Sequence, residues 1–216
     1  MTITLIIATL VLFLTVFSFL WRWVSRHGSF PCPVWLAWIM EIPILDKIID
    51  IQRSLDHMGL QAGQRILEIG PGAGRLLIPA AKRVLPGGEA VGLEIQAAMI
   101  ERLQKRAAQA GVSNLSMIWG DASQCPILSE SFDMIYLSLV LGEITDREAA
   151  LRQCYRALKA GGLLSITELF LDPHYQRRRT VRRFAEAAGF ISDRQYGNWF
   201  IFTMNFVKPS EENFYG

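Results

Sequence analysis

The chain has 216 residues, of which 51% are hydrophobic and 19% are charged, and its formal net charge at pH 7 is +2. This length suits one domain with a sizeable core, and the near-neutral net charge gives no support for nucleic-acid binding. Cys32, Cys125 and Cys154 are too few and too widely spaced for a disulfide framework, which suits a reducing compartment, and we expect no metal site.

An apolar segment opens the chain, because residues 1–21 carry no charged side chain. About 20 residues of helix rise roughly 30 Å, which is enough to cross a bilayer core. We therefore predict a transmembrane helix over residues 1–24. A cleaved signal peptide fits less well, since no basic residue precedes the segment, and a buried core helix is the other alternative. Arg22 and Arg26 follow the segment, so the positive-inside rule predicts an outside N-terminus and a cytoplasmic location for the body of the protein.

Residues 25–59 form a second region with a proline-rich start. Pro31 and Pro33 stop the preceding helix from continuing. Trp35 and Trp38 then favour a short interfacial helix at headgroup depth. The alternative is an N-terminal helix that packs against the following domain and covers a ligand bound there, and both interpretations stay open.

From residue 60 onward, apolar strand patterns alternate with helical ones. We expect strands at 65–69, 90–94, 115–119, 132–140, 163–170, 190–195 and 199–207, and helices at 74–84, 96–110, 146–159 and 175–188. Thr145 and Glu148 fit a capping box at the start of the third of these helices. Such alternation predicts a mostly parallel sheet with helices on both faces. Only Gly197 and Asn198 separate the last two strands, which predicts an antiparallel hairpin at one edge.

A glycine-rich turn joins the first strand to the first helix, with Gly70, Gly72 and Gly74 in G-x-G-x-G spacing. Glycine lets the backbone approach a ligand and frees the amides at the start of the following helix. Glu94 ends the second strand, where a carboxylate can accept both hydroxyls of a ribose. Asp121 follows the third strand and could accept a hydrogen bond from an adenine amino group. The simpler interpretations are turn glycines, a surface carboxylate and a helix cap.

Five motifs in chain order carry a family resemblance, and they occupy residues 67–74, 91–94, 120–122, 131–136 and 157–164. With them, the chain from about residue 60 to residue 208 resembles class I S-adenosylmethionine-dependent methyltransferases. The similarity is greatest to the branch of ubiquinone/menaquinone C-methyltransferases and phospholipid N-methyltransferases. It implies S-adenosylmethionine as cofactor and a Rossmann-like α/β domain over residues 60–216. This domain would have a seven-stranded sheet that ends in an antiparallel hairpin.

The resemblance also implies which residues hold the cofactor. In that family Glu68 and the glycines face the methionine part, Glu94 faces the ribose, and Asp121 with its neighbours faces the adenine. The expected cofactor-binding residues are therefore Glu68, Gly70, Pro71, Gly72, Gly74, Glu94, Ile95, Asp121 and Ala122.

Three residues are catalytic candidates: Glu143, His174 and Tyr175. Glu143 would lie at the carboxyl end of the fourth strand, where open α/β sheets bind ligands. It could hold an amine or polarise water, and the alternative is a charge that flanks a helix. His174 and Tyr175 follow the fifth strand and could abstract a proton or bind a headgroup. For His174 the alternative is a helix cap. The family's histidine-rich stretch is replaced here by residues 139–144, which leaves the general base open.

Arginines crowd residues 177–183, either on a solvated face or against anionic lipid phosphates. We expect a membrane-anchored methyltransferase, because a tether raises the enzyme's effective concentration at the bilayer. Its acceptor would be lipid-soluble: a phospholipid amine, a quinone or another isoprenoid. The alternatives are a methyltransferase that acts on a membrane protein and a non-catalytic subunit of a membrane complex. N-, O- and C-methylation all stay open.

Overall fold

The computed structural model describes residues 5, 9, 16 and 49–210. Most of residues 1–24, for which a transmembrane helix was predicted, and most of residues 25–59, for which an interfacial segment was predicted, lie outside the described residues.

The location predicted from the N-terminal segment needs correction. A span requires about 20 consecutive apolar helical residues. The longest helix bounded within residues 49–210, α6 (Ala97–Gln109), has only 13 residues. Across the described part of the chain, no helix has both the length and the apolarity to cross a membrane. This finding contradicts the prediction of a single-pass membrane protein with an outside N-terminus, and that prediction is withdrawn.

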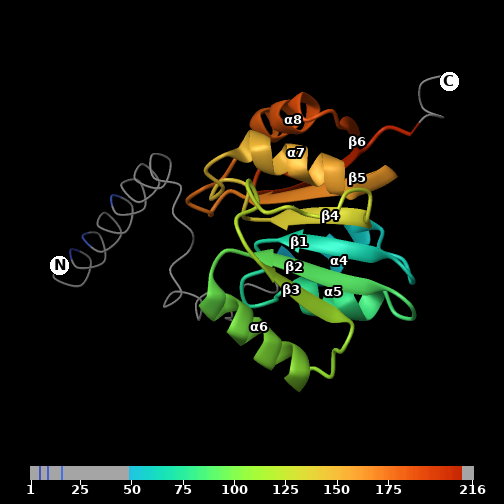
Figure 1. Cartoon of the computed structure of the whole chain (residues 1–216). Coiled ribbons are helices and arrows are strands. Elements are labelled where there is room, and N and C mark those ends of the chain that lie inside the picture. The colour runs from blue at the N-terminus through green and yellow to red at the C-terminus, as the bar shows by residue number, and fades with distance from the viewer. Residues whose placement is uncertain (1–4, 6–8, 10–15, 17–48, 211–216) are drawn as a thin grey trace.

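Seven strands form one sheet, in the order β3-β2-β1-β4-β5-β7-β6 (Figure 1). The strands are β1 (Arg65–Ile69), β2 (Glu89–Glu94), β3 (Leu115–Trp119), β4 (Phe132–Ser138), β5 (Leu158–Leu169), β6 (Ile191–Gly197) and β7 (Ile201–Val207). The first five strands are mutually parallel, whereas β7 runs antiparallel to both β5 and β6. The predicted seven-stranded, mostly parallel sheet with an antiparallel hairpin at one edge is confirmed.

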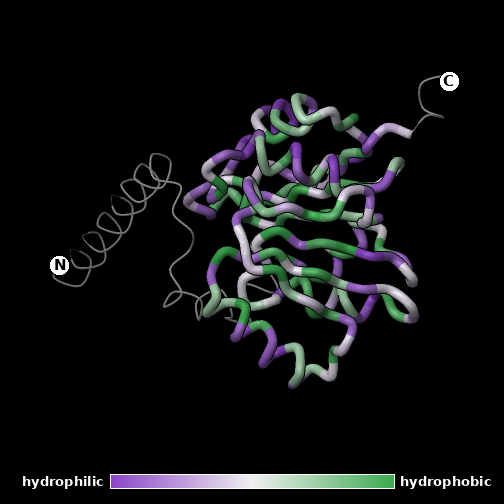
Figure 2. The backbone as a smooth tube through the Cα atoms, viewed as in Figure 1, coloured by the Kyte–Doolittle hydropathy of each residue, from purple (hydrophilic) through white to green (hydrophobic). Residues whose placement is uncertain are grey.

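Helices cover both faces of the sheet, as Figure 1 shows. They are α4 (Ile51–Met58), α5 (Leu77–Arg83), α6 (Ala97–Gln109), α7 (Arg147–Ala157) and α8 (Arg178–Ala187). One buried cluster joins α7 and α8 to the sheet, and a second joins α4, α5 and α6 to the opposite face. The central strands are therefore hydrophobic along most of their length (Figure 2), as expected of a parallel sheet that is buried on both faces.

Several boundaries differ from the predictions for local reasons. The N-cap of α7 is Asp146, whose Oδ1 accepts a hydrogen bond from the Ala149 amide at 2.8 Å, so the predicted capping box at Thr145 is wrong. Strand β5 begins at Leu158, where it pairs with Phe132 ahead of a register shift. The fourth strand ends earlier than predicted, because Leu139 has a positive φ of 59° that breaks the extended conformation.

Candidate functional site

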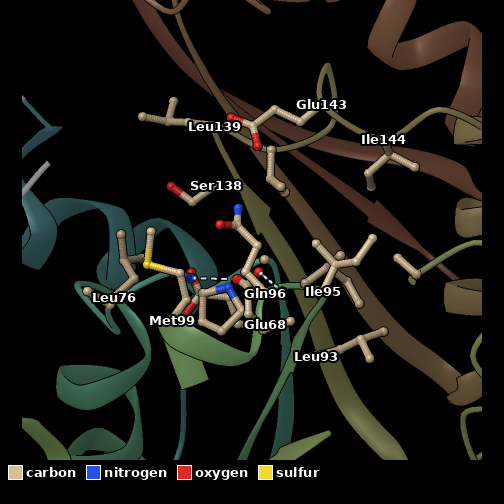
Figure 3. Close-up of a pocket in the computed structure, with 18 of the residues that line it drawn as sticks. Glu68, Leu76, Leu93, Ile95, Gln96, Met99, Ser138, Leu139, Glu143 and Ile144 are labelled. Carbon is tan, nitrogen blue, oxygen red and sulfur yellow. Dashed lines mark hydrogen bonds between the residues drawn. The ribbon is translucent and has the colours of Figure 1, made fainter. Parts of the chain in front are cut away.

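A cavity of about 280 Å³ lies at the carboxyl ends of the central parallel strands. Its walls come from the segments that follow β1, β2, β3 and β4, because parallel strands bring their carboxyl ends to one edge. Figure 3 shows Glu68, Gln96 and Met99 on one side of the cavity, with Leu139, Glu143 and Ile144 on the opposite side. Eight of the nine residues predicted to bind the cofactor line this cavity; the ninth, Gly74, lies in the chain between two lining residues, Ala73 and Arg75.

The three glycines of the turn after β1 have positive φ angles, but each meets different surroundings. A Cβ on Gly70 would lie 2.5 Å from Val140 Cγ2, and a Cβ on Gly74 would lie 2.8 Å from Leu103 Cγ. These two glycines allow the turn to pack tightly on its neighbours. A Cβ on Gly72 would meet no atom within 4 Å, so this residue leaves room on the cavity wall. Because α5 begins only at Leu77, the freed amides belong to the turn and not to a helix end.

Glu94 links the turn after β1 to the segment after β2 through hydrogen bonds of its side chain. Its side chain is only 5% exposed. The two carboxylate oxygens accept hydrogen bonds from the Gly72 amide at 3.1 Å and from the Gln96 amide at 3.0 Å. Burial raises the pKa of Glu94, and the amide bonds oppose this rise. An ionised carboxylate offers about four acceptor positions, so Glu94 keeps capacity for the hydroxyls of a ligand.

Glu68 lies deeper in the same wall, with 3% of its surface exposed. Its Oε2 atom has no hydrogen-bond partner among the described residues. Burial raises the pKa of Glu68 to about 8; an interaction with the Tyr136 hydroxyl lowers it, and the Glu94 charge raises it further. A buried polar atom without a partner is costly, which is typical of a site built to meet a ligand.

Asp121 combines a structural role with a place on the cavity wall. Its Oδ1 accepts hydrogen bonds from the Ser123 amide at 2.8 Å and from the Ser123 hydroxyl at 2.7 Å, which caps the local turn. Next to it, the Trp119 indole donates a hydrogen bond of 3.0 Å to the Ile95 carbonyl. Ile95 lines the cavity and is half exposed. Trp119 therefore fixes a wall residue, a role that the sequence did not predict.

The structure brings together two of the three catalytic candidates. Glu143 lines the cavity, and its Oε1 lies 3.9 Å from Nδ1 of His174. The same nitrogen lies 3.8 Å from Oδ1 of Asp172, and His174 Nε2 is buried with no partner among the described residues. Burial lowers the pKa of His174 and the Arg147 charge lowers it further, so the imidazole is neutral at neutral pH. A neutral imidazole can accept a proton.

Neither His174 nor Tyr175 is among the described residues that line the cavity. Tyr175 instead packs edge-on against Phe170 and Phe202, with ring centroids 5.6 Å and 6.1 Å away. His174 is 7% exposed and lies behind Glu143, so any action on a ligand in the cavity would pass through that carboxylate.

Two charged residues that the sequence analysis did not select hold this region in place. The Arg147 guanidinium donates to the carbonyls of Leu141 at 3.0 Å and Gly142 at 2.7 Å. Glu168 is almost fully buried, which raises its pKa well above the usual value, and its Oε2 accepts a hydrogen bond of 2.9 Å from the Gln176 amide. Arg147 therefore fixes the segment that carries Glu143, and Glu168 fixes the segment that carries His174. The available sequence signal for Glu168 was a charge near the end of the strand expected over residues 163–170, which is otherwise uncharged.

Comparison with known proteins identifies relatives for most of the described domain. The model of the methyltransferase domain family matches residues 60–199. The ubiquinone/menaquinone biosynthesis C-methyltransferase of Pectobacterium carotovorum is 32% identical over 129 residues, which are 59% of this chain and 51% of that protein. The protein of the same name from Yersinia enterocolitica is 33% identical over 116 residues, which are 53% of this chain and 46% of that protein. The chain thus spans about half the length of the curated relatives it matches.

Solved structures share the fold at lower sequence identity. A SAM-dependent methyltransferase from Aquifex aeolicus has a TM-score of 0.76 and 18% identity, with 82% of this chain and 99% of that chain covered. Phosphoethanolamine N-methyltransferase 2 from Haemonchus contortus, solved with S-adenosyl-L-methionine, has a TM-score of 0.64 and 18% identity. That comparison covers 74% of this chain and 52% of the other. At these identities the likeness concerns the fold.

Proposed function

The chain belongs to the methyltransferase domain family, and from that premise we propose that it transfers a methyl group from S-adenosylmethionine to a lipid-soluble small molecule of the quinone type. One observation carries this proposal. A single cavity joins a wall of buried carboxylates and a glycine turn to an opposite wall that is largely apolar.

The residues on the first wall fit S-adenosylmethionine. The Glu94 carboxyl group would hold the sugar hydroxyls, since each of its oxygens accepts only one amide hydrogen bond and keeps a free acceptor position. Gly72 leaves space for the ligand, and the orphaned Glu68 oxygen is suited to a cationic group. When bound, the cofactor supplies a methyl group on an electron-poor sulfonium sulfur.

The second wall supports an apolar acceptor. Leu139, Val140 and Ile144 line it, and their side chains would exclude water from the acceptor and orient its ring for in-line transfer. Glu143 is the titratable side chain among them and would take the proton that the acceptor releases. His174, neutral and 3.9 Å behind it, would position that carboxylate. The names of the relatives from Pectobacterium and Yersinia support an acceptor of the quinone type.

Incubation of the purified full chain with methyl-labelled cofactor and a cell extract tests this function. We expect label in products that partition into organic solvent. Label that appears only in water-soluble products would contradict the acceptor class. Label on polypeptide would instead favour the alternative of a protein methyltransferase. Cofactor uptake without any labelled product would favour a non-catalytic subunit. The Glu94→Gln variant is the control in which both cofactor uptake and labelling should fall.

A further inference from the structure

Glu68, which lines the cavity, is paired with a buried tyrosine, Tyr136, and the inference from this pair rests on the proposed function. Glu68 and Tyr136 occupy matching register positions on the adjacent parallel strands β1 and β4, so their side chains lie on the same face of the sheet. Tyr136 is fully buried in the core cluster beneath that face. Its hydroxyl interacts with the Glu68 carboxyl, yet no hydrogen bond of ordinary geometry joins them. Both Tyr136 Oη and Glu68 Oε2 therefore lack a conventional partner among the described residues.

The surroundings keep both groups in their neutral forms. Burial acts against a charge on Glu68 and also raises the pKa of Tyr136 well above its usual value. The tyrosine hydroxyl thus stays protonated and can act as a donor toward a carboxylate. The charged groups that share the cavity wall with Glu68 come from several segments, namely Arg75, Glu94, Arg106, Asp121 and Glu143. Of these, Glu94 acts directly on Glu68 and favours its neutral form.

We propose that Glu68 is a carboxylic acid before the cofactor binds and a carboxylate afterwards, with the Tyr136 hydroxyl beside it as a hydrogen-bond donor. The O–H bond of the Glu68 carboxyl breaks and the proton passes to the solvent. The positive charges of S-adenosylmethionine then face a carboxylate, since a nearby opposite charge favours the ionised form. Tyr136 is the positioning residue, because its hydroxyl donates to the carboxylate that forms. Cofactor binding is therefore coupled to proton release.

Calorimetric titration of the full chain with S-adenosylmethionine at pH 7, in buffers of different ionisation enthalpy, tests the coupling. The dependence of the binding heat on buffer gives the number of protons released. With the pKa of Glu68 raised to about 8, we expect between about half a proton and one proton released per cofactor. Binding with no proton release, or with proton uptake, would overturn the proposal and leave the proposed function standing. A failure to bind cofactor at all would contradict the proposed function itself.

Three variants assign the proton. Glu68→Gln is isosteric with the neutral acid, and it should bind the cofactor with proton release reduced to about 0.1 or less. Glu143→Gln, on the opposite side of the same cavity, is the matched control and should release as many protons as the unmodified chain. If Glu143→Gln instead removed the proton release, the assignment to Glu68 would be wrong.

Tyr136→Phe keeps the buried ring and removes only the hydroxyl. We expect proton release to persist while the cofactor affinity falls by about tenfold or more, because the carboxylate loses a donor. A purely structural role of Tyr136 would lower the unfolding midpoint and leave the affinity of the folded protein unchanged. That result would contradict its role as a positioning residue.

Discussion

The contact between Gly70 and Val140 offers a quantitative test of how the cavity is built. A Cβ on Gly70 would lie 2.5 Å from Val140 Cγ2, and the φ of Gly70 is +65°. A side chain in the left-handed region costs about 1–2 kcal/mol. Overpacking costs about a further 1–3 kcal/mol. We therefore expect Gly70→Ala to lower the free energy of unfolding by about 2–5 kcal/mol.

A double-mutant cycle separates the two contributions. Val140→Ala removes the clashing methyl groups and alone should cost about 1–2 kcal/mol, since Val140 is half-buried. In the double variant the overpacking is relieved, so the combined loss should be smaller than the sum by about 1–3 kcal/mol. Urea denaturation of the four proteins measures this coupling.

Gly72→Ala is the matched control for the same turn. Its φ is +51°, yet its Cβ would meet no atom within 4 Å. We expect a stability loss of only about 1–2 kcal/mol and no coupling to Val140→Ala. Strict additivity of Gly70→Ala and Val140→Ala, within about 0.5 kcal/mol, would refute the packing argument.

Three further predictions concern Glu68 and the residues that pack behind the cavity. Glu68 has a raised pKa in the folded protein, so its stabilising effect is present below the unfolded pKa of 4.5 and is lost as pH rises toward about 8. In urea denaturation between pH 5 and 8, the free energy of unfolding of Glu68→Gln should therefore rise relative to that of the unmodified chain, by up to about 1.4 kcal/mol per pH unit. A difference that stays constant with pH would contradict this. Arg147→Met should lower the free energy of unfolding by about 1–3 kcal/mol. It should also reduce methyl transfer, measured by labelled turnover, more than cofactor affinity, measured by calorimetry, because only the segment with Glu143 loses its anchor. Equal losses of turnover and of affinity would refute this role of Arg147. His174→Gln should slow turnover at unchanged cofactor affinity. Tyr175→Phe, in the aromatic cluster, should leave turnover unchanged. Equal effects of the two substitutions on turnover would contradict the role of His174 behind Glu143.

The sequence predicted the sheet well because its signals were local and repeated. Each apolar strand up to β4 is followed by a helix or a turn at regular intervals, and Gly197 and Asn198 marked the hairpin. The G-x-G-x-G turn and Glu94 were also predictable, since a ligand needs backbone access and a carboxylate at adjacent strand ends. Their place in one cavity follows from parallel pairing of β1 with β2.

The network behind the cavity could not be predicted in the same way. Glu168 and Gln176 meet only because the segment after β5 folds back on itself. Leu139, in a left-handed conformation, donates a hydrogen bond of 2.9 Å from its amide to the Thr167 carbonyl on β5. In the sequence, Tyr136 is indistinguishable from an ordinary strand residue. Its position beside Glu68 becomes known only from the register in which β1 and β4 pair. In each case the informative contact joins residues that are distant in sequence.

Direct measurement of cofactor binding to the full chain, with Glu94→Gln in parallel, tests the central claim that this cavity takes S-adenosylmethionine. We expect one cofactor per chain and a loss of affinity of about tenfold or more in the variant, since a charge-assisted hydrogen bond is worth about 1.5–3 kcal/mol. Absence of binding by the unmodified chain, or equal affinity in the variant, would contradict the account.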